Sequence, residues 1–222
     1  DNVEDTISRH FRYSLSHVLW RFSEYTRFVK TVPSLSCVGR FIYHRRKCHG
    51  KRTLAKSTGG NACRKNIQAE VSIIARTGWT TDELWLGIQV NPPQGTFDLV
   101  SLLIGVNNQY RGYEINEYRE QLRFLLGKSI EYAGNDANRV IVLSIPDWGV
   151  TPFASGRDRE QIAKDIDAFN AVNREESEKA GVHFIDVNPI SREAVNDLSL
   201  IASDNLHPSG KMYFEWAKLA LP

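Results

Sequence analysis

The stretch "FDLVSLLIG", residues 97–105, is apolar at nearly every position. Half-exposed strands alternate apolar and polar residues, whereas a strand buried on both faces is apolar throughout. The stretch therefore predicts an interior strand of a sheet that is covered on both sides. A second run of this kind, "RVIVLSIPD" at residues 139–147, is ended by Pro146. Two such strands indicate a sheet that is sandwiched between helices.

Helical patterns alternate with these runs. The apolar residues of 114–133 stand three and four positions apart, as on one face of a helix. The other expected helices are 80–90, 158–181 and 208–221, and the further expected strands are 70–75 and 182–187. This alternation predicts an α/β fold over residues 66–222, a three-layer α/β/α arrangement with a parallel sheet. Ligands of such folds bind at the carboxyl ends of the strands.

Charge divides the 222 residues unevenly, although the net charge is only +2. Residues 1–65 hold 14 basic and 4 acidic side chains, while residues 66–222 hold 14 basic and 22 acidic ones. The first part also contains all three cysteines and four of the six histidines. We therefore separate a basic segment, 1–65, which lacks the regular periodicity of a native domain, from an α/β domain, 66–222.

The basic segment suggests two functions of its own. Basic residues mixed with aromatic ones are typical of nucleic-acid binding, but here they follow no helical face. Zinc could be held by Cys37, Cys48 and Cys63 with His44 or His49, but structural zinc sites usually contain cysteines two to four residues apart. An odd cysteine count does not favour disulfides. We expect neither a nucleic-acid partner nor a metal.

Two further features concern location. No apolar run approaches the length of about 18 residues that a membrane-spanning helix needs. The first residues are polar and acidic, unlike a signal peptide, so we expect a cytoplasmic protein with no membrane span.

The stretch "SDNLHPSG", residues 203–210, is the first candidate for chemistry. Asp204 and His207 stand three residues apart in a short loop before a helix. The carboxylate can then accept a hydrogen bond from Nδ1 of His207, which leaves Nε2 as a general base. A capping aspartate beside a surface histidine is the alternative interpretation.

Two other loops follow predicted strands. In "LLIGVNNQYRG", residues 102–112, Asn107 comes just after a buried strand, where its amide can donate to a developing oxyanion. In "ARTGWTTDEL", residues 75–84, the N–H of Gly78 can face the same crevice. Glycine and asparagine are also common in ordinary turns.

Together these stretches resemble the SGNH, or GDSL-type, serine hydrolase family. Gly78 matches the glycine block, Asn107 the asparagine block, and Asp204 with His207 the closing D-x-x-H-P block. The chain has Asn108 where the family usually has aspartate. The resemblance covers residues 66–222. It implies the SGNH hydrolase fold, which is flavodoxin-like. It also implies hydrolysis of a small-molecule ester through an acyl-enzyme, without a cofactor, with Ser, Gly and Asn lining the oxyanion hole.

The family's first block, Gly-Asp-Ser at the end of the first strand, is absent. Codons that encode residues 37–46, read one base later, can spell Val-Leu-Gly-Asp-Ser-Tyr-Thr-Ile-Gly. The serine codon would then straddle the codons of Phe41 and Ile42. Our hypothesis is that residues 36–65 are a frameshifted translation, so that the first strand–helix unit is aberrant and the nucleophile is missing.

Aromatic residues in the loops after the predicted strands are candidates for contact with substrate. Trp79, Tyr110, Trp148 and Phe153 lie there and could line an acyl or sugar pocket, or simply pack. The stretch 145–156 is the most plausible substrate-facing loop. The identity of the ester and the oligomeric state are left open.

Overall fold

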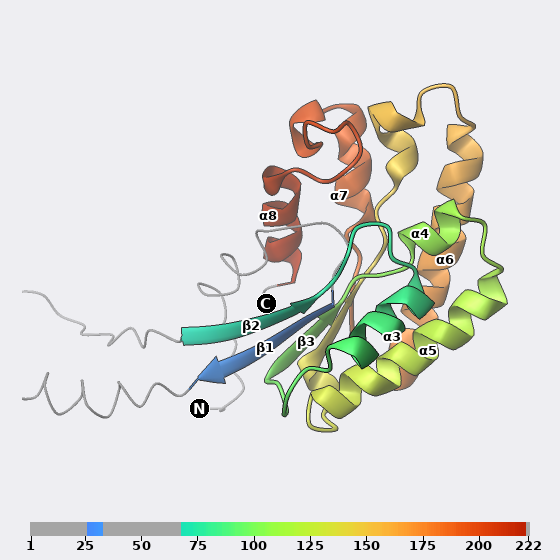
Figure 1. Cartoon of the computed structure of the whole chain (residues 1–222). Coiled ribbons are helices and arrows are strands. Elements are labelled where there is room, and N and C mark those ends of the chain that lie inside the picture. Colours follow the sequence, from blue (N-terminus) through green and yellow to red (C-terminus); the bar gives the residue numbers. More distant parts are fainter. Residues whose placement is uncertain (1–25, 33–67, 221–222) are drawn as a thin grey trace, which may run out of the picture.

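The computed structural model describes residues 26–32 and 68–220 (Figure 1). These residues form a five-stranded sheet in the order β2-β1-β3-β4-β5. The strands are β1 (Thr26–Val32), β2 (Gln68–Ile74), β3 (Leu99–Leu102), β4 (Val140–Leu143) and β5 (His183–Ile185). The α-helices are α3 (Thr81–Val90), α4 (Val106–Tyr110), α5 (Ile115–Tyr132), α6 (Arg159–Ala180), α7 (Asn188–Arg192) and α8 (Gly210–Leu219). Single 3₁₀ turns cover 137–139, 148–150, 152–154, 193–195 and 198–200.

Strand β1 runs in the opposite direction to the other four strands of the sheet. Neighbours β3, β4 and β5 pair in parallel, whereas β1 pairs antiparallel with both β2 and β3. Strand β2 therefore points the same way as β3. The parallel sheet expected from the sequence is confirmed for β2 to β5, and β1 is the exception. No strand was expected at residues 26–32, which lie in the basic segment, because their place in the sheet depends on contacts that are distant in sequence.

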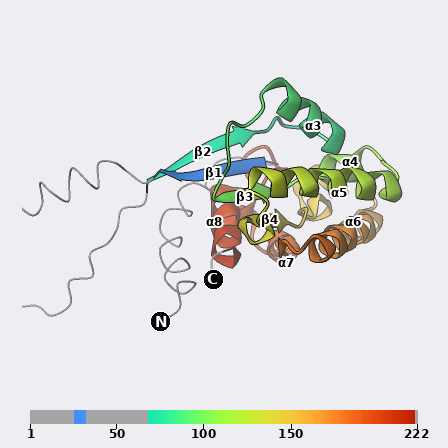
Figure 2. The same cartoon turned by 90° about the horizontal axis from the view of Figure 1, so that it is seen from below.

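Helices cover both faces of the sheet, as Figures 1 and 2 show. Helices α3, α5 and α6 lie on one face, and their buried residues form one apolar cluster with those of β3 and β4. Helices α7 and α8 lie on the other face, around a smaller cluster that includes Met212 and Trp216. This confirms the three-layer α/β/α prediction.

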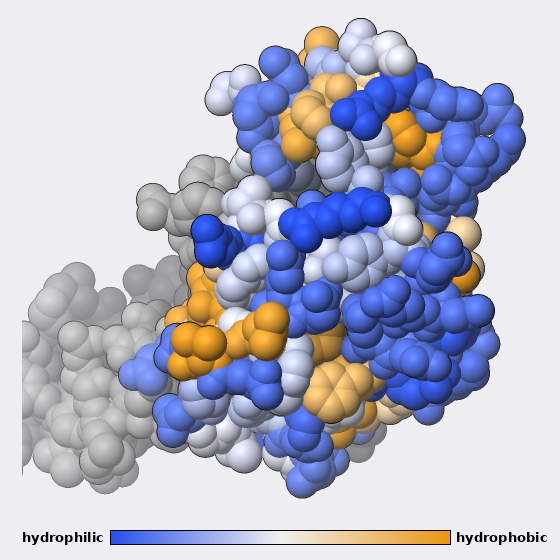
Figure 3. Space-filling view, turned by 45° about the vertical axis from the view of Figure 1, so that its right-hand side comes forward, coloured by the Kyte–Doolittle hydropathy of each residue, from blue (hydrophilic) through white to orange (hydrophobic). Residues whose placement is uncertain are grey.

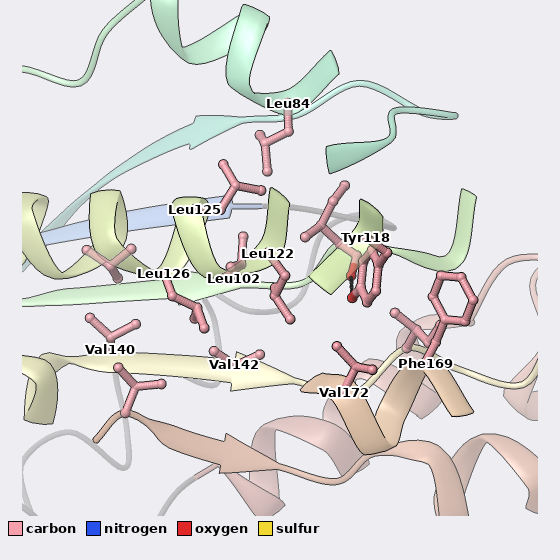
Figure 4. Packing of buried hydrophobic residues seen from close by; sticks show 14 of the residues in the cluster. Leu84, Leu102, Tyr118, Leu122, Leu125, Leu126, Val140, Val142, Phe169 and Val172 are labelled. Carbon is pink, nitrogen blue, oxygen red and sulfur yellow. Dashed lines mark hydrogen bonds between the residues drawn. The ribbon is translucent and has the colours of Figure 1, made fainter. Parts of the chain in front are cut away.

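Tyr118 of α5 belongs to the larger cluster and lies beside Phe169 (Figure 4). Its side chain is completely buried, and its ring lies 4.7 Å from that of Phe169 on α6. The hydroxyl donates to an oxygen of Asn173 at 2.5 Å and lies 3.2 Å from the carbonyl oxygen of Ile104. A buried hydroxyl that is satisfied in this way ties α5, α6 and the end of β3 into one unit.

The helix ends follow from local sequence. The N–H of Thr80 donates to the Glu83 carboxylate at 2.9 Å, which satisfies a backbone group at the start of α3. Helix α6 ends at Gly181, whose φ of 71° lies in the left-handed region that favours glycine. Both ends were expected from the sequence.

The outer surface agrees with these amphipathic helices. On the face that Figure 3 shows, hydrophilic side chains predominate and apolar ones form separate areas. Within the described ranges, no helix is both long and apolar enough to cross a membrane.

Candidate active site

The loop before α8 holds the predicted Asp204–His207 contact. The Asp204 carboxylate lies 2.6 Å from Nδ1 of His207, and it also accepts from the N–H groups of His207 at 2.9 Å and Leu206 at 3.0 Å. Asn205 lies between them with a φ of 64°, a left-handed conformation that asparagine tolerates better than most residues. This tight turn brings the carboxylate back over the ring, as the three-residue spacing predicts.

The contact determines which nitrogen of His207 carries hydrogen. Burial raises the pKa of Asp204, but hydrogen bonds from the N–H of His207, its ring and the N–H of Leu206 outweigh burial and lower the pKa to about 2. Asp204 is therefore a carboxylate near neutral pH and can only accept. The hydrogen of the contact is then on Nδ1, so Nε2 of a neutral ring has a lone pair that can take a proton.

This pKa predicts how pH affects the loop. The pKa of Asp204 falls from 3.8 to about 2 on folding, so its stabilisation is complete above about pH 4 and is lost as pH falls toward 2. The side chain is 51% exposed, so screening by solvent should limit the effect to about 1 kcal/mol or less. The free energies of unfolding in urea of the unsubstituted chain and of Asp204→Asn should differ at pH 6. They should converge as the pH falls from about 4 toward 2. A difference that stays constant down to pH 2 would contradict this prediction.

Gly78 and Asn107 meet at the carboxyl ends of β2 and β3. The Asn107 side chain donates through Nδ2 to the carbonyl oxygen of Trp79 at 3.1 Å, which holds the two loops together. Gly78 has a φ of 89°, which favours glycine at this position. Within the part of the chain that the structure describes, the N–H of Gly78 has no hydrogen-bond acceptor. It is therefore available as a donor, as an oxyanion hole requires.

Arg111 links these two loops and was missed by the sequence reasoning. Its guanidinium donates to the carbonyl oxygen of Gly78 at 2.5 Å and to both carboxylate oxygens of Glu83 at 3.2 Å. Its backbone N–H donates to the carbonyl oxygen of Asn107 at 3.0 Å. Arg111 thus contacts both residues that offer the candidate oxyanion donors. Its place in "NNQYRG", shortly after Asn107, is the one sequence feature that could have indicated this role.

Asn108, which departs from the usual aspartate, is fully buried and structural. Its side-chain oxygen accepts from the N–H of Thr81 at 3.1 Å, and its Nδ2 donates to Oγ1 of Thr81 at 2.7 Å. Oγ1 of Thr81 in turn donates to Gln121. The Asn108 side chain thus satisfies both the first N–H of α3 and the Thr81 hydroxyl.

Replacing Asn108 should reveal this role. Asn108→Ala leaves the buried N–H of Thr81 without an acceptor and opens a small cavity, so we expect a loss of about 2 kcal/mol of stability. Asn108→Asp should cost less, because the Thr81 hydroxyl can turn to donate to the carboxylate. Urea unfolding at pH 7 measures both. Equal losses for the two variants would show that a carboxylate cannot replace the amide here, and would contradict this prediction.

Aromatic residues connect the loop that contains Asp204 and His207 with the helix that contains Asn107. Phe153 donates its N–H to the carbonyl oxygen of Asn205 at 3.1 Å. Its ring lies 6.2 Å from that of Tyr110, at the end of α4, the helix that contains Asn107. Trp148 joins the same group, whereas Trp79 packs against Gly87 of α3. Three of the four candidate aromatic residues therefore cluster together.

A hollow of about 370 Å³ borders the 150–159 segment, and none of the candidate site residues lines it. It is lined by Val150, Pro152, Ser155, Arg159, Ala194, Val195 and Leu198. Phe41 and Ile42, where the serine codon would fall, lie outside the described residues, and so do Cys37, Cys48, Cys63, His44 and His49. Within the described residues, no group of three or more His, Cys, Asp or Glu side chains could hold a metal.

The fold and the arrangement at its carboxyl edge are typical of α/β enzymes that hydrolyse carboxylic esters. The chain belongs to the GDSL-like lipase/acylhydrolase family, whose model matches residues 51–213. The matched range includes Gly78, Asn107, Asp204 and His207, and it begins after Phe41 and Ile42.

Similar solved structures support the fold. An acetylxylan esterase from Geobacillus stearothermophilus, Axe2, is 21% identical with a TM-score of 0.51, over 65% of this chain and 67% of that one. LAE5, an alpha/beta hydrolase enzyme from the metagenome of Lake Arreo in Spain, is 19% identical with a TM-score of 0.51 over the same shares. No curated protein sequence matches the chain.

Proposed function

We propose that this chain carries the base and oxyanion parts of a serine ester hydrolase and lacks the nucleophile. His207 is the base, Asp204 orients it, and Gly78 with Asn107 serves the oxyanion. The observation that carries the proposal is the 2.6 Å contact between the Asp204 carboxylate and Nδ1 of His207. A capping aspartate needs only backbone donors, so the added ring contact favours a working pair over a simple cap.

The proposed reaction follows from these positions. In a chain that has the serine of the family's first block, its Oγ would attack the ester carbonyl carbon while Nε2 of His207 takes the hydroxyl proton. The oxyanion of the tetrahedral intermediate accepts from the Gly78 N–H and the Asn107 amide. The C–O bond of the ester then breaks, and the imidazolium returns its proton to the leaving alcohol. Water repeats the sequence on the acyl-serine, which releases the carboxylic acid and restores the hydroxyl.

The direction of β1 supports a missing nucleophile. Strands β2 to β5 point their carboxyl ends toward the candidate site, but β1 runs the opposite way between β2 and β3. The register places Thr26, the first residue of β1, opposite Ile74 and Leu102. The carboxyl end of β1 therefore lies beside the amino ends of β2 and β3, at the opposite end of the strands from Gly78 and Asn107. The direction of β1 agrees with the hypothesis of a frameshift over residues 36–65, which would remove the family's first strand–helix unit.

Labelling with a fluorophosphonate probe tests this proposal. The probe reacts with an activated serine, so we expect little or no labelling of the chain as it stands. Labelling that His207→Ala abolishes would contradict the missing nucleophile and would leave the ester-hydrolase assignment intact. Sequencing the coding DNA is the second test, because codons across residues 37–46 that do not allow Gly-Asp-Ser would rule out the frameshift.

A further inference from the structure

One arginine and three aromatic rings form a compact group at the surface, here called the arginine–aromatic cluster. The ring centroids of Tyr110, Trp148 and Phe153 lie 5.3 to 6.2 Å apart. The Cζ atom of Arg157 is 5.3 Å from the rings of Tyr110 and Phe153 and 5.4 Å from that of Trp148. A guanidinium that contacts three ring faces is held by cation–π attraction in one position.

The cluster connects the two parts of the candidate site. Tyr110 follows Asn107 by about one turn of helix α4. Gln109 of the same helix accepts a hydrogen bond from Nε1 of Trp148 at 2.7 Å. On the other side, the N–H of Phe153 donates to Asn205, two residues before His207. A molecule whose ester lies between Asn107 and His207 would therefore reach the cluster with an adjoining group.

The charge of Arg157 is uncompensated within the described ranges. Its guanidinium donates to the Tyr110 hydroxyl at 3.2 Å, and no carboxylate of the described chain lies within 4.0 Å of it. The neighbouring Asp158 carboxylate accepts from the N–H of Gln161 at the start of α6. A guanidinium has five N–H groups, so most of its donors remain for a ligand.

The aromatic part of the cluster is open to solvent. Tyr110 is 44% exposed and Phe153 is 40% exposed, whereas Trp148 beneath them is 7% exposed. Exposed ring faces beside a fixed cation suit a molecule that combines a flat or ring-shaped apolar face with a negative charge. The guanidinium fork matches the two oxygens of a carboxylate.

We infer that the arginine–aromatic cluster binds a carboxylate carried on a ring-shaped part of the substrate. One carboxylate contacts the N–H groups of Arg157, and the ring that bears it lies against Tyr110 and Phe153. This inference rests on the proposed function for the position of the ester, and it makes the substrate class acidic ring-containing esters. The binding itself requires no nucleophile.

Calorimetric titration of the full chain with sodium glucuronate tests the inference at low ionic strength, where exposed charges are least screened. Glucose is the neutral comparison, and benzoate replaces the sugar by an aromatic ring. We expect Arg157→Met to weaken glucuronate binding about tenfold or more, since one charge-assisted contact is lost. Methionine keeps apolar contact with the rings, so thermal unfolding should show that the variant is folded.

Arg174→Met is the matched control. Arg174 also lies over an aromatic ring, with Cζ 4.7 Å from Phe184, but it is paired with Asp186 at 3.3 Å. This variant should bind glucuronate as the natural chain does. Binding of benzoate but not glucuronate, lost in Arg157→Met, would support the carboxylate site and identify an aromatic acid as its ligand.

Three results would overturn the inference: equal binding of glucose and glucuronate, equal binding by Arg157→Met, or no binding of either acid. The last would mean that Arg157 only packs over the rings. None of these results depends on hydrolysis. A chain that binds the acids through Arg157 and never acquires esterase activity would contradict the proposed function alone.

Discussion

Restoring the reading frame across residues 36–65 should raise the rate of p-nitrophenyl acetate hydrolysis by about 10⁴-fold or more. Loss of the nucleophile in serine hydrolases removes a factor of about 10⁶ from kcat, and binding with oxyanion stabilisation leaves only a small residual rate. The restored chain would contain serine at the junction of the Phe41 and Ile42 codons, on a strand that precedes the Gly78 and Asn107 loops. The measurement is kcat/KM for the two chains at pH 7 to 8.

The controls separate true catalysis from a change in folding. His207→Ala in the restored chain should return the rate nearly to that of the chain as it stands, because serine then lacks its base. Replacing the restored serine by alanine should do the same, and thermal unfolding should be unchanged in both variants. A folded restored chain with no gain in rate would refute the frameshift hypothesis, and a gain that survives His207→Ala would refute the role of His207.

The same restoration should place a parallel strand between β2 and β3. In the present chain that position is taken by β1, whose backbone pairs antiparallel on both sides. An apolar strand that ends in Gly-Asp-Ser would point its carboxyl end to the edge where Gly78 and Asn107 lie. A parallel central strand is buried on both faces, which suits the shifted sequence better than "TRFVKTV".

Local sequence predicted much of the fold because its signals are local. The apolar spacing of 114–133 corresponds to α5, and Gly181 ends α6 at a positive φ. The contact between Asp204 and His207 was also predictable, since it spans only three residues and one turn. Elements whose partners lie within a few residues can be inferred from spacing and residue type.

Contacts between distant segments account for the rest. The place of Thr26–Val32 in the sheet depends on pairing with residues at least 36 positions away. Arg157 is a candidate ligand-binding residue only because it contacts Tyr110, which is 47 positions away in the chain. Asn108 is hydrogen-bonded to Thr81, which is 27 positions away. The sequence alone therefore could not show why asparagine rather than aspartate stands at this position. None of these pairings leaves a periodic signal that a single sequence could reveal.

Gly105→Ala should be the most destabilising single substitution near the site. Gly105 precedes α4 with a φ of 123°, which residues with a Cβ atom rarely adopt. A Cβ atom there would lie 2.4 Å from the hydroxyl oxygen of Tyr118. Tyr118 cannot move aside easily, because it is fully buried and its hydroxyl is bonded to Asn173. Backbone strain of about 1–3 kcal/mol and overpacking of similar size together predict a loss of about 3–5 kcal/mol.

Gly112→Ala isolates the backbone part of this effect. Gly112 also has a positive φ, 74°, but a Cβ atom there would have no neighbour within 4 Å, so we expect a loss of about 1 kcal/mol. Urea unfolding of both variants measures the difference. The consequences extend to the site, because Gly105 sets the start of the helix that contains Asn107. If the two variants lose equal stability, Tyr118 does not constrain the turn at Gly105. The inference that the buried Tyr118 fixes the start of the helix containing Asn107 would then be wrong.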